Sequence, residues 1–443
     1  MRGSRWKLVS FRPPAALPFA RERHTPRKGG PPGERNWPRT TGYDRPAPKG
    51  NATLTKTRCV VCESNDWLRL PDPSKSKSIT TAGMIVDEPL GKSQCRSCGL
   101  VARTEHPALG DSDYYENHYT AYYERPGTEV FNEPRYAAMA RWIAAAAAGF
   151  EPATIVEVGC GRGWTLRELQ RLYPEASIDG IEPSRQNSDE ARKHGFRVWT
   201  QKLDSANVPD SRYDLVFSNH VLQHTSDPIG FLTAMGMLAG ERGLVVVAVD
   251  LSGASNELLF SDQNYSFLPA HLVSLAEKAG LTVLAWENTP DLENLMFSQM
   301  IVCSKSAEGR TPSRARGIAD LDAQTLAALY GRRVHYLEAW HRIDEFLCWK
   351  TSGRRSIYNF GGGMYSYLLA CYCEKYWSSV TACAVDGFSG VCVGKEVVPL
   401  ETLHPDANDR VVTGTRPILQ QPLAARLRAL GWETVSWDNF AAG

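Results

Sequence analysis

One short stretch in the middle of the chain restricts the fold more than any other feature. The apolar segment Thr154–Val158 predicts a buried strand that runs into the glycine loop Gly159–Gly163, and Trp164–Leu172 then has the pattern of a helix. A strand, a glycine loop and a helix in this order open a doubly wound α/β fold. Glycines let a ligand approach the backbone closely, and the amino terminus of a helix is partly positive. We therefore expect a ligand site at this loop.

Acidic and polar residues follow the next predicted strands. The strand Ser177–Ile181 ends in Glu182, nineteen residues beyond the glycine loop, where a carboxylate can accept both hydroxyls of a ribose. Leu203-Asp204 and the strand Tyr213–His220 come later. With its G-x-G-x-G loop, this combination resembles the class I S-adenosylmethionine-dependent methyltransferases. Dinucleotide-binding proteins, the alternative, have the spacing G-x-G-x-x-G.

The resemblance covers residues 154–303 and implies cofactor-binding roles. Glu182 would hold the ribose of S-adenosylmethionine, Asp204 would face the adenine, and Asn219 would close the site at the end of its strand. The other cofactor-binding residues that it implies are Glu157, Gly159, Gly161 and Gly163. Two further predicted strands with a helix between them would complete the sheet: Gly243–Val249, His271–Ala279 and Leu281–Ala285.

Two C-x-x-C pairs before this core predict a metal site. They are Cys59 with Cys62 and Cys95 with Cys98, and 32 residues separate them. Each short turn directs two sulfurs at one point, and four thiolates suit a structural zinc ion without an open position for substrate. A hairpin loop such as Pro71–Thr81 can absorb the unusually long separation. Redox dithiols or plain buried cysteines are the alternatives, whereas a disulfide framework is disfavoured because the other seven cysteines stand singly and no secretion signal is present.

An aromatic segment lies between the cysteines and the glycine loop. Tyr115, Tyr119 and Tyr122 recur at helical spacing. Such a stripe is typical of core packing, and it can also place one or two phenols across a ligand pocket.

The carboxyl-terminal region contains a second unit of strand, glycine turn, helix and strand. After a polar linker at 304–317 and a predicted helix Leu321–Trp349, the unit consists of Ser356–Phe360, Gly361–Gly363, Met364–Tyr376 and Val380–Val385. We expect a small Rossmann-like lobe whose glycine turn can meet a phosphate or a sugar nucleotide.

These patterns predict an α/β protein with a Rossmann-like class I methyltransferase core, an amino-terminal zinc-binding module and a second, smaller Rossmann-like domain. The expected boundaries are 1–52 for a basic tail, 53–125 for the zinc module with its aromatic segment, 126–304 for the methyltransferase domain and 318–443 for the carboxyl-terminal domain. This order is similar to that of the C-methyltransferases of deoxysugar biosynthesis, which methylate a carbon beside a ketone on a nucleotide-linked sugar.

The chain departs from that family at the predicted base. Where the family has Glu-His, this chain has Asp262-Gln263, and glutamine cannot accept a proton near neutral pH. The candidates for the catalytic base are therefore Asp262, His220 and His224. Because the sulfonium of S-adenosylmethionine is itself a strong electrophile, carbon, oxygen and nitrogen acceptors all remain open.

The charge distribution bears on the partner. Residues 1–50 carry twelve Arg and Lys, three Asp and Glu and nine prolines, which predicts a disordered basic tail and leaves −8 for the rest of a chain whose net charge is +1. An acidic body favours a small-molecule acceptor, possibly a nucleotide-linked sugar, over nucleic acid. No apolar run is long enough for a membrane helix, so a soluble, cytoplasmic protein is expected. A nucleic-acid methyltransferase and an inactive scaffold with this fold are the alternatives.

Overall fold

The computed structural model describes residues 58–106, 113–119, 129–147, 149–253, 256–289, 298–306, 321–387 and 389–440. The predicted basic tail 1–52 and residues 307–317 of the predicted linker lie outside these ranges. Among the helices within them, none has the combination of length and apolar character that a membrane-spanning segment requires.

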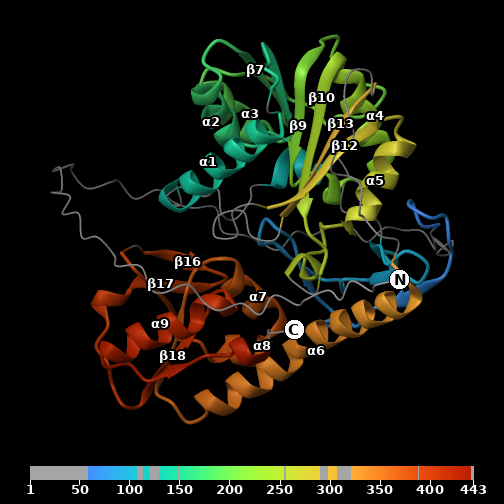
Figure 1. The fold of residues 1–443 in the computed structure, drawn as a ribbon. Helices are drawn as coiled ribbons and strands as arrows, with labels where there is room; N and C mark the ends of the chain where they lie inside the picture. The colour runs from blue at the N-terminus through green and yellow to red at the C-terminus, as the bar shows by residue number, and fades with distance from the viewer. Residues whose placement is uncertain are drawn as a thin grey trace, which may run out of the picture. The chain divides into compact units, whose positions relative to one another are not determined.

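A seven-stranded sheet forms the centre of the chain (Figure 1). Six strands run in the same direction, and the strand next to the edge, β13, runs antiparallel to both of its neighbours. The chain leaves β6 toward one edge and returns to the other side of it at β9, so the topological switch point lies between these two strands. This topology confirms the predicted doubly wound α/β core. In spatial order the strands are β12 (Thr282–Asn288), β13 (Ser298–Ser304), β10 (Ala239–Asp250), β9 (Tyr213–Asn219), β6 (Thr154–Val158), β7 (Ser177–Ile181) and β8 (Arg197–Trp199).

Helices cover both faces of this sheet (Figure 1). Strand β10 shows why, because Val245, Val247 and Val249 point into one apolar core while its alternate residues point into the other. Strands β6 and β7 and helix α2 have the predicted bounds, and α1 contains Pro134. One face carries α1 (Glu129–Ala146), α2 (Trp164–Leu172) and α3 (Arg185–Lys193), and the other carries α4 (Pro228–Leu238) and α5 (Pro269–Lys278).

The cysteine-containing module builds a small antiparallel sheet in the order β1-β4-β5-β11. The long separation between the C-x-x-C pairs contains β1 (Trp67–Arg69), a hairpin of β2 (Ser78–Ile79) and β3 (Ile85–Val86), and the start of β4 (Lys92–Cys95). The last strand, β11 (Tyr265–Ser266), pairs with β5 (Val101–Arg103) although it comes from within the predicted methyltransferase segment. A strand of two residues leaves no periodic pattern, so this pairing was not apparent in the sequence.

The carboxyl-terminal region forms a six-stranded sheet in the order β16-β17-β15-β14-β18-β19. The predicted helix Met364–Tyr376 divides into α7 and α8 at Cys373, because the carboxylate of Asp344 accepts a hydrogen bond from the backbone N–H of Tyr376 and caps the second helix. The elements are α6 (Ala323–Thr351), β14 (Ser356–Phe360), α7 (Met364–Tyr372), α8 (Glu374–Ser379), β15 (Ala382–Val385), β16 (Gly390–Cys392), β17 (Lys395–Pro399), β18 (Asp409–Thr413), α9 (Pro417–Ala429) and β19 (Thr434–Val435).

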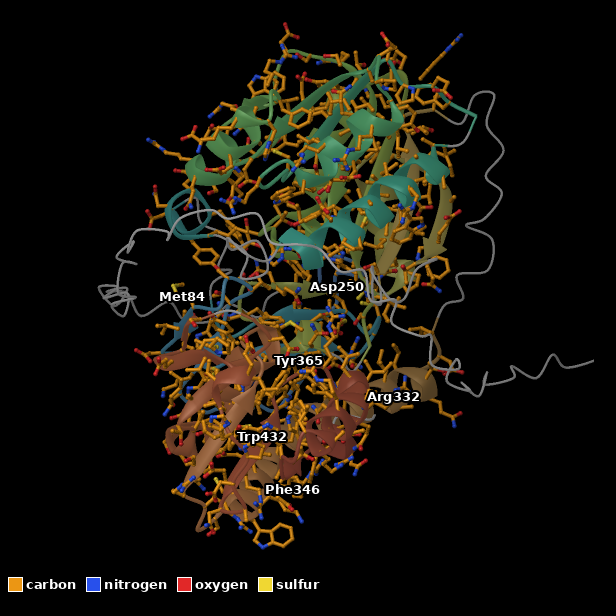
Figure 2. All side chains as sticks on the ribbon, turned by 90° about the vertical axis from the view of Figure 1, so that its left-hand side faces the viewer. Met84, Asp250, Arg332, Phe346, Tyr365 and Trp432 are labelled. Atoms are coloured by element: carbon orange, nitrogen blue, oxygen red, sulfur yellow. The ribbon has the colours of Figure 1, made fainter. Side chains whose placement is uncertain are left out.

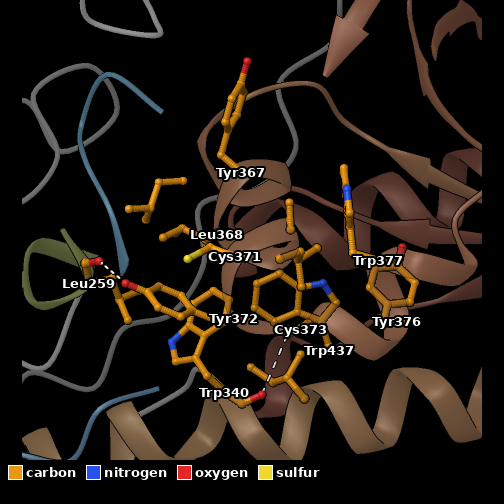
Figure 3. Close-up of a cluster of buried hydrophobic side chains, with 14 of the residues drawn as sticks. Leu259, Trp340, Tyr367, Leu368, Cys371, Tyr372, Cys373, Tyr376, Trp377 and Trp437 are labelled. Carbon is orange, nitrogen blue, oxygen red and sulfur yellow. Dashed lines mark hydrogen bonds between the residues drawn. The ribbon is translucent and has the colours of Figure 1, made fainter. Parts of the chain in front are cut away.

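One apolar core joins the carboxyl-terminal sheet to the cysteine module. Trp340 of α6 packs against Tyr372 and Trp437, and the Tyr372 hydroxyl donates to the carbonyl oxygen of Leu259 (Figure 3). The same core includes residues of the small sheet and its hairpin: Leu70, Ile79, Leu90 and Val101. The segment after β10 is therefore held between the two regions by burial of apolar area.

Two buried cations reinforce this junction. The Arg333 side chain of α6 is fully buried and donates to Oε1 of Gln94 at 2.6 Å, to the Gly99 carbonyl at 2.8 Å and to Oγ of Ser252 at 2.6 Å. A further hydrogen bond of 3.2 Å reaches the carbonyl of Gly253. Arg333 thus ties the cysteine module to the loop that follows β10.

The second cation, Lys92, gives the fold a pH dependence. Burial lowers the pKa of Lys92 to about 7, and its ammonium donates to the carbonyl of Glu257 at 3.1 Å. Between about pH 7 and the ordinary value of 10.5 the unfolded chain binds more protons at Lys92 than the folded chain, so Lys92 makes stability rise with pH across this window.

We expect this contribution to total roughly 5 kcal/mol over the whole window. Urea unfolding of the natural protein and of Lys92→Met at pH 7 and pH 9.5 measures it, because titrations that both proteins share cancel in the difference. Parallel pH profiles for the two proteins would contradict the assignment.

Candidate functional site

A deep pocket opens at the carboxyl ends of β6 and β9, on both sides of the switch point. Its volume is about 1140 Å³ including the part open to solvent. In doubly wound folds this is the usual position of a ligand. The lining includes Glu157 and Val158 at the end of β6, Glu182 after β7, and Asn219 and His220 at the end of β9. Four predicted site residues, Glu157, Glu182, Asn219 and His220, thus come together here from three parts of the chain.

The glycine loop forms one wall of the pocket. Gly159 and Gly161 line it, both with positive φ, and a Cβ at Gly159 would lie 2.3 Å from Cγ2 of Val221. The third glycine, Gly163, is not among the lining residues. Gly163 packs against Ala191, and a Cβ added at Gly163 would lie 3.1 Å from the Cβ of Ala191. Gly163 therefore serves the packing of helix α2 in this structure.

Backbone hydrogen bonds hold the Glu182 carboxylate in place at the pocket wall. It is buried, and its two oxygens accept hydrogen bonds of 2.9 Å from the backbone N–H groups of Gly161 and Ser184. A carboxylate accepts hydrogen bonds on both oxygens, and this one lines the pocket. The side chain is thus suited to the vicinal hydroxyls of a ribose.

The rest of the wall has buried polar atoms that suit a polar ligand. Both amide atoms of Asn187 in α3, and Oδ1 of Asn219, are buried without a hydrogen-bond partner among the described residues. Buried polar groups without partners are rare in native proteins and fit a ligand that supplies the missing hydrogen bonds. Asn187 was not predicted as a site residue, because nothing in its sequence position indicates that it lines the pocket.

The structure places Asp204 outside the pocket. Its side chain is exposed and accepts a hydrogen bond of 2.8 Å from the backbone of Ala206. The preceding residues Gln201, Lys202 and Leu203 line the pocket instead. The role that the resemblance implies for Asp204 therefore has no geometric support here.

His220 lies at the pocket with a backbone conformation that few side chains adopt. Its φ is +56°, and its Nδ1 lies 3.3 Å from Oδ1 of Asp250, the last residue of β10. Oγ of Ser298 lies 3.2 Å from Nε2, so both ring nitrogens have partners. Burial raises the pKa of the Asp250 carboxyl, but the facing His220, with Arg135 and His224, lowers it, and the net shift is downward. Gln263 donates to the second oxygen of this carboxylate at 2.9 Å.

His224 lies one turn further along, and one of its ring nitrogens has a partner. Its Nδ1 lies 2.8 Å from the backbone carbonyl oxygen of Asp262, while Nε2 has no hydrogen-bond partner in the described part of the chain. The ring lines the pocket and meets that of Tyr115 edge to face. Tyr115 and Tyr119 both line the pocket, which supports the ligand-facing alternative for the aromatic stripe, while Tyr122 lies outside the described residues.

The Asp262 carboxylate is not part of the pocket. It is completely buried and accepts hydrogen bonds from the backbone N–H of Thr81 at 2.8 Å, from the Thr81 hydroxyl at 2.6 Å and from the Tyr114 hydroxyl at 3.2 Å. The structure thus separates the three candidate bases, with both histidines at the pocket and the carboxylate behind it.

The four cysteines converge in the amino-terminal module. All four sulfurs lie within 4.8 Å of one another, with 3.6 Å between Cys59 and Cys98 and 3.5 Å between Cys62 and Cys95. Tetrahedral coordination at the usual Zn–S distance of about 2.3 Å would place the sulfurs about 3.8 Å apart, so the cluster fits that ion. Hydrogen bonding to Cys95 raises the pKa of Cys59 to about 12, and hydrogen bonding to Cys59 lowers that of Cys95. Such a cluster resists holding several thiolates unless a cation compensates their charge.

His271 supports this cluster from α5. The backbone N–H of Leu268 donates to Nδ1, so Nε2 carries the proton and donates to the carbonyl of Cys98 at 2.8 Å. Burial lowers the pKa of His271 to about 4, so the ring is neutral near pH 7. A hydrogen bond to the backbone of a ligating residue fixes the direction of its side chain.

Comparison with known proteins agrees with the geometry of the pocket. Residues 131–287 match the family model of a methyltransferase domain. The chain is similar to a malonyl-[acyl-carrier protein] O-methyltransferase of Halalkalibacterium halodurans, with 24% identity over 152 residues, 32% of this chain and 55% of that protein. A trans-aconitate 2-methyltransferase of Methylobacterium nodulans is 40% identical over 73 residues, 16% of this chain and 28% of that protein. The chain thus spans about half or less of the length of these relatives.

A solved structure resembles the chain only in part. It is the complex between the Haloferax volcanii Trm112 methyltransferase activator and a methyltransferase, with a TM-score of 0.36 and 19% identity over 41% of this chain and 94% of that one.

Proposed function

Because the chain contains a class I S-adenosylmethionine-dependent methyltransferase domain, we propose that the protein transfers a methyl group from S-adenosylmethionine to a small-molecule acceptor. The observation that carries the proposal is the pocket at the switch point, where Glu182, Gly159 and Gly161 meet the buried amide of Asn187. The carboxylate, the glycine loop and the amide could each bind a part of S-adenosylmethionine.

The cofactor would be held by residues of four elements. Glu182 would accept hydrogen bonds from the ribose hydroxyls. The glycine loop, which has no side chains at Gly159 and Gly161, would let the methionine part approach the backbone. Asn187 and Asn219 would form hydrogen bonds with polar atoms of the cofactor. When bound, S-adenosylmethionine supplies an activated methyl group on a sulfonium sulfur. Tyr115, Tyr119 and the two histidines would then surround the acceptor at the mouth of the pocket.

For the acceptor we propose a sugar or a nucleotide-linked sugar. The order of a four-cysteine module, a methyltransferase core and a second α/β domain supports this proposal, as does the net charge of −8 outside the first fifty residues, which disfavours a nucleic-acid track. The relatives named above are a malonyl-[acyl-carrier protein] O-methyltransferase and a trans-aconitate 2-methyltransferase, which match 32% and 16% of this chain.

For the cysteine cluster we propose one structural zinc ion. Four thiolates leave no open coordination position, so the ion would stabilise the small sheet and take no part in the chemistry. The cluster geometry and the support of Cys98 by His271 favour this assignment over a redox role.

Binding of S-adenosylhomocysteine, measured by calorimetry, tests the pocket. We expect Glu182→Ala to weaken binding at least about 100-fold, because two hydrogen bonds to a charged acceptor are lost at about 1.5 to 3 kcal/mol each. The matched control is Asp204→Ala, an exposed carboxylate that does not line the pocket, for which we expect an affinity within about twofold of the natural protein. Unchanged affinity in Glu182→Ala would refute the cofactor site.

A further inference from the structure

The segment that replaces the base of the resembled family is held from behind the pocket. The Asp262 carboxylate is completely buried, and its three hydrogen bonds come from Thr81 and Tyr114. Thr81 follows strand β2 of the amino-terminal hairpin, and Tyr114 precedes the pocket-lining Tyr115. A carboxylate with three donors and no place at the pocket wall cannot meet a substrate.

The backbone of the same segment, however, reaches the pocket. The carbonyl oxygen of Asp262 lies 2.8 Å from Nδ1 of His224. A carbonyl can only accept, so Nδ1 must carry the proton, and in the neutral ring Nε2 is then the acceptor. The neighbouring Asn264 donates to the backbone carbonyl of His224 at 2.7 Å, so both the ring and the main chain of this histidine are held.

His220 is bound differently and is less suited to take a proton from an acceptor. Its Nδ1 faces the Asp250 carboxylate and its Nε2 contacts the Ser298 hydroxyl. Of the two histidines at the pocket, only His224 combines a determined proton position with a ring nitrogen that has no partner within the described ranges.

We propose that His224 is the catalytic base and that Asp262 is a positioning residue, which acts on His224 through its main-chain carbonyl while its carboxylate anchors the segment to Thr81 and Tyr114. This proposal rests on the proposed methyl-transfer function and narrows its acceptor. A carboxylate acceptor needs no base, whereas a base matters for an acceptor that must lose a proton, such as a hydroxyl group or a C–H beside a ketone.

The proton balance is simple. Nε2 of His224 takes the proton of the acceptor atom, and the electron pair left on that atom forms the bond to the methyl carbon as the electrons of the methyl–sulfur bond remain on sulfur. The imidazolium that forms keeps its Nδ1–H bond to the Asp262 carbonyl. It then releases the Nε2 proton to water, which restores the starting tautomer.

Nitrogen NMR of the full-length protein labelled at histidine tests the proposal without any acceptor. Long-range ¹H–¹⁵N spectra distinguish the two neutral tautomers of each ring, and His224→Gln and His220→Gln assign the signals. We expect His224 to be predominantly in the Nδ1–H form, which is the less common tautomer of free histidine. We also expect S-adenosylhomocysteine to shift the Nε2 signal of His224 and to leave that of His271 in place.

Two variants form a crossed control. Thr81→Val removes one donor to the Asp262 carboxylate, and we expect it to move the tautomer ratio of His224 by up to about fivefold, corresponding to a net hydrogen bond of ~1 kcal/mol, without affecting His220. Asp250→Asn should change the signals of His220 and spare the tautomer of His224.

An Nε2–H form of His224, or no response of its Nε2 to S-adenosylhomocysteine, would overturn the proposal, and both are observed in the natural protein, the variants serving only to assign the signals. A calorimetric titration of the natural protein with S-adenosylhomocysteine distinguishes failure of the proposed function from failure of the roles given to His224 and Asp262. Absent binding would refute the proposed function, whereas binding together with the wrong tautomer would refute only the roles of His224 and Asp262.

Discussion

Replacement of Arg333 by alanine is expected to lower the free energy of unfolding by about 3 to 5 kcal/mol, the range found when one partner of a buried charged network is removed. The guanidinium is fully buried, and four groups accept its hydrogen bonds. Burial lowers the pKa of Arg333 to about 10, so the side chain is still charged at neutral pH. The substitution would leave the acceptors of Gln94, Gly99, Ser252 and Gly253 without a donor and open a cavity beside them.

The neighbouring Arg332 provides the matched control, because it belongs to the same helix and is exposed (Figure 2). Arg332→Ala should change stability by no more than about 0.5 kcal/mol. Arg333→Lys should restore little, since a single ammonium cannot reach all four acceptors on the two segments. Urea unfolding monitored by tryptophan fluorescence measures all three variants. Equal stability of Arg333→Ala and Arg332→Ala would show that the network does not hold the loop after β10.

The second large effect concerns the cysteine cluster. We expect the purified protein to contain one zinc ion per chain, and Cys95→Ser to lose the ion and unfold the small sheet. Cys95 ends β4, and its backbone N–H donates to the carbonyl of Leu100, so the same residue would hold both the ion and the turn. Apparent binding free energies of structural zinc are about 10 to 16 kcal/mol in small domains, which exceeds the stability that such a sheet has by itself.

The control is Cys303→Ala, which removes a thiol from the central sheet. Burial raises the pKa of Cys303 to about 12, so its side chain is neutral, and it does not belong to the cysteine cluster. Metal analysis and circular dichroism should show a full complement of zinc in this variant and none in Cys95→Ser. A Cys95→Ser protein that keeps both its zinc and its melting temperature would contradict the structural role.

Much of the core was predictable because its signals are local. Strands β6 and β7 and helix α2 follow from short apolar runs and a glycine loop within thirty residues. The convergence of the cysteines also follows from local turns, since each C-x-x-C pair directs its own two sulfurs. The pocket position follows from the rule that ligands bind at the switch point of a doubly wound sheet.

The roles of individual acids were not predictable in the same way. Glu182 and Asp204 both follow predicted strands, yet one lies in the pocket wall and the other is exposed. Asp262 is of a residue type that can act as a base, but its carboxylate accepts a hydrogen bond from Thr81, 181 positions earlier. Pairings over such distances depend on how the sheets pack, which periodicity does not encode.

The sequence by itself determined the class of fold, the glycine loop with its acidic partner, and the four sulfurs that can share one ion, because each depends on neighbours in the chain. Only the tertiary structure decided which nitrogen of His224 carries the proton, since a main-chain carbonyl is present at every residue and its direction depends on packing. The same reason applies to Arg333, whose four acceptors are brought together by a core that spans three regions of the chain.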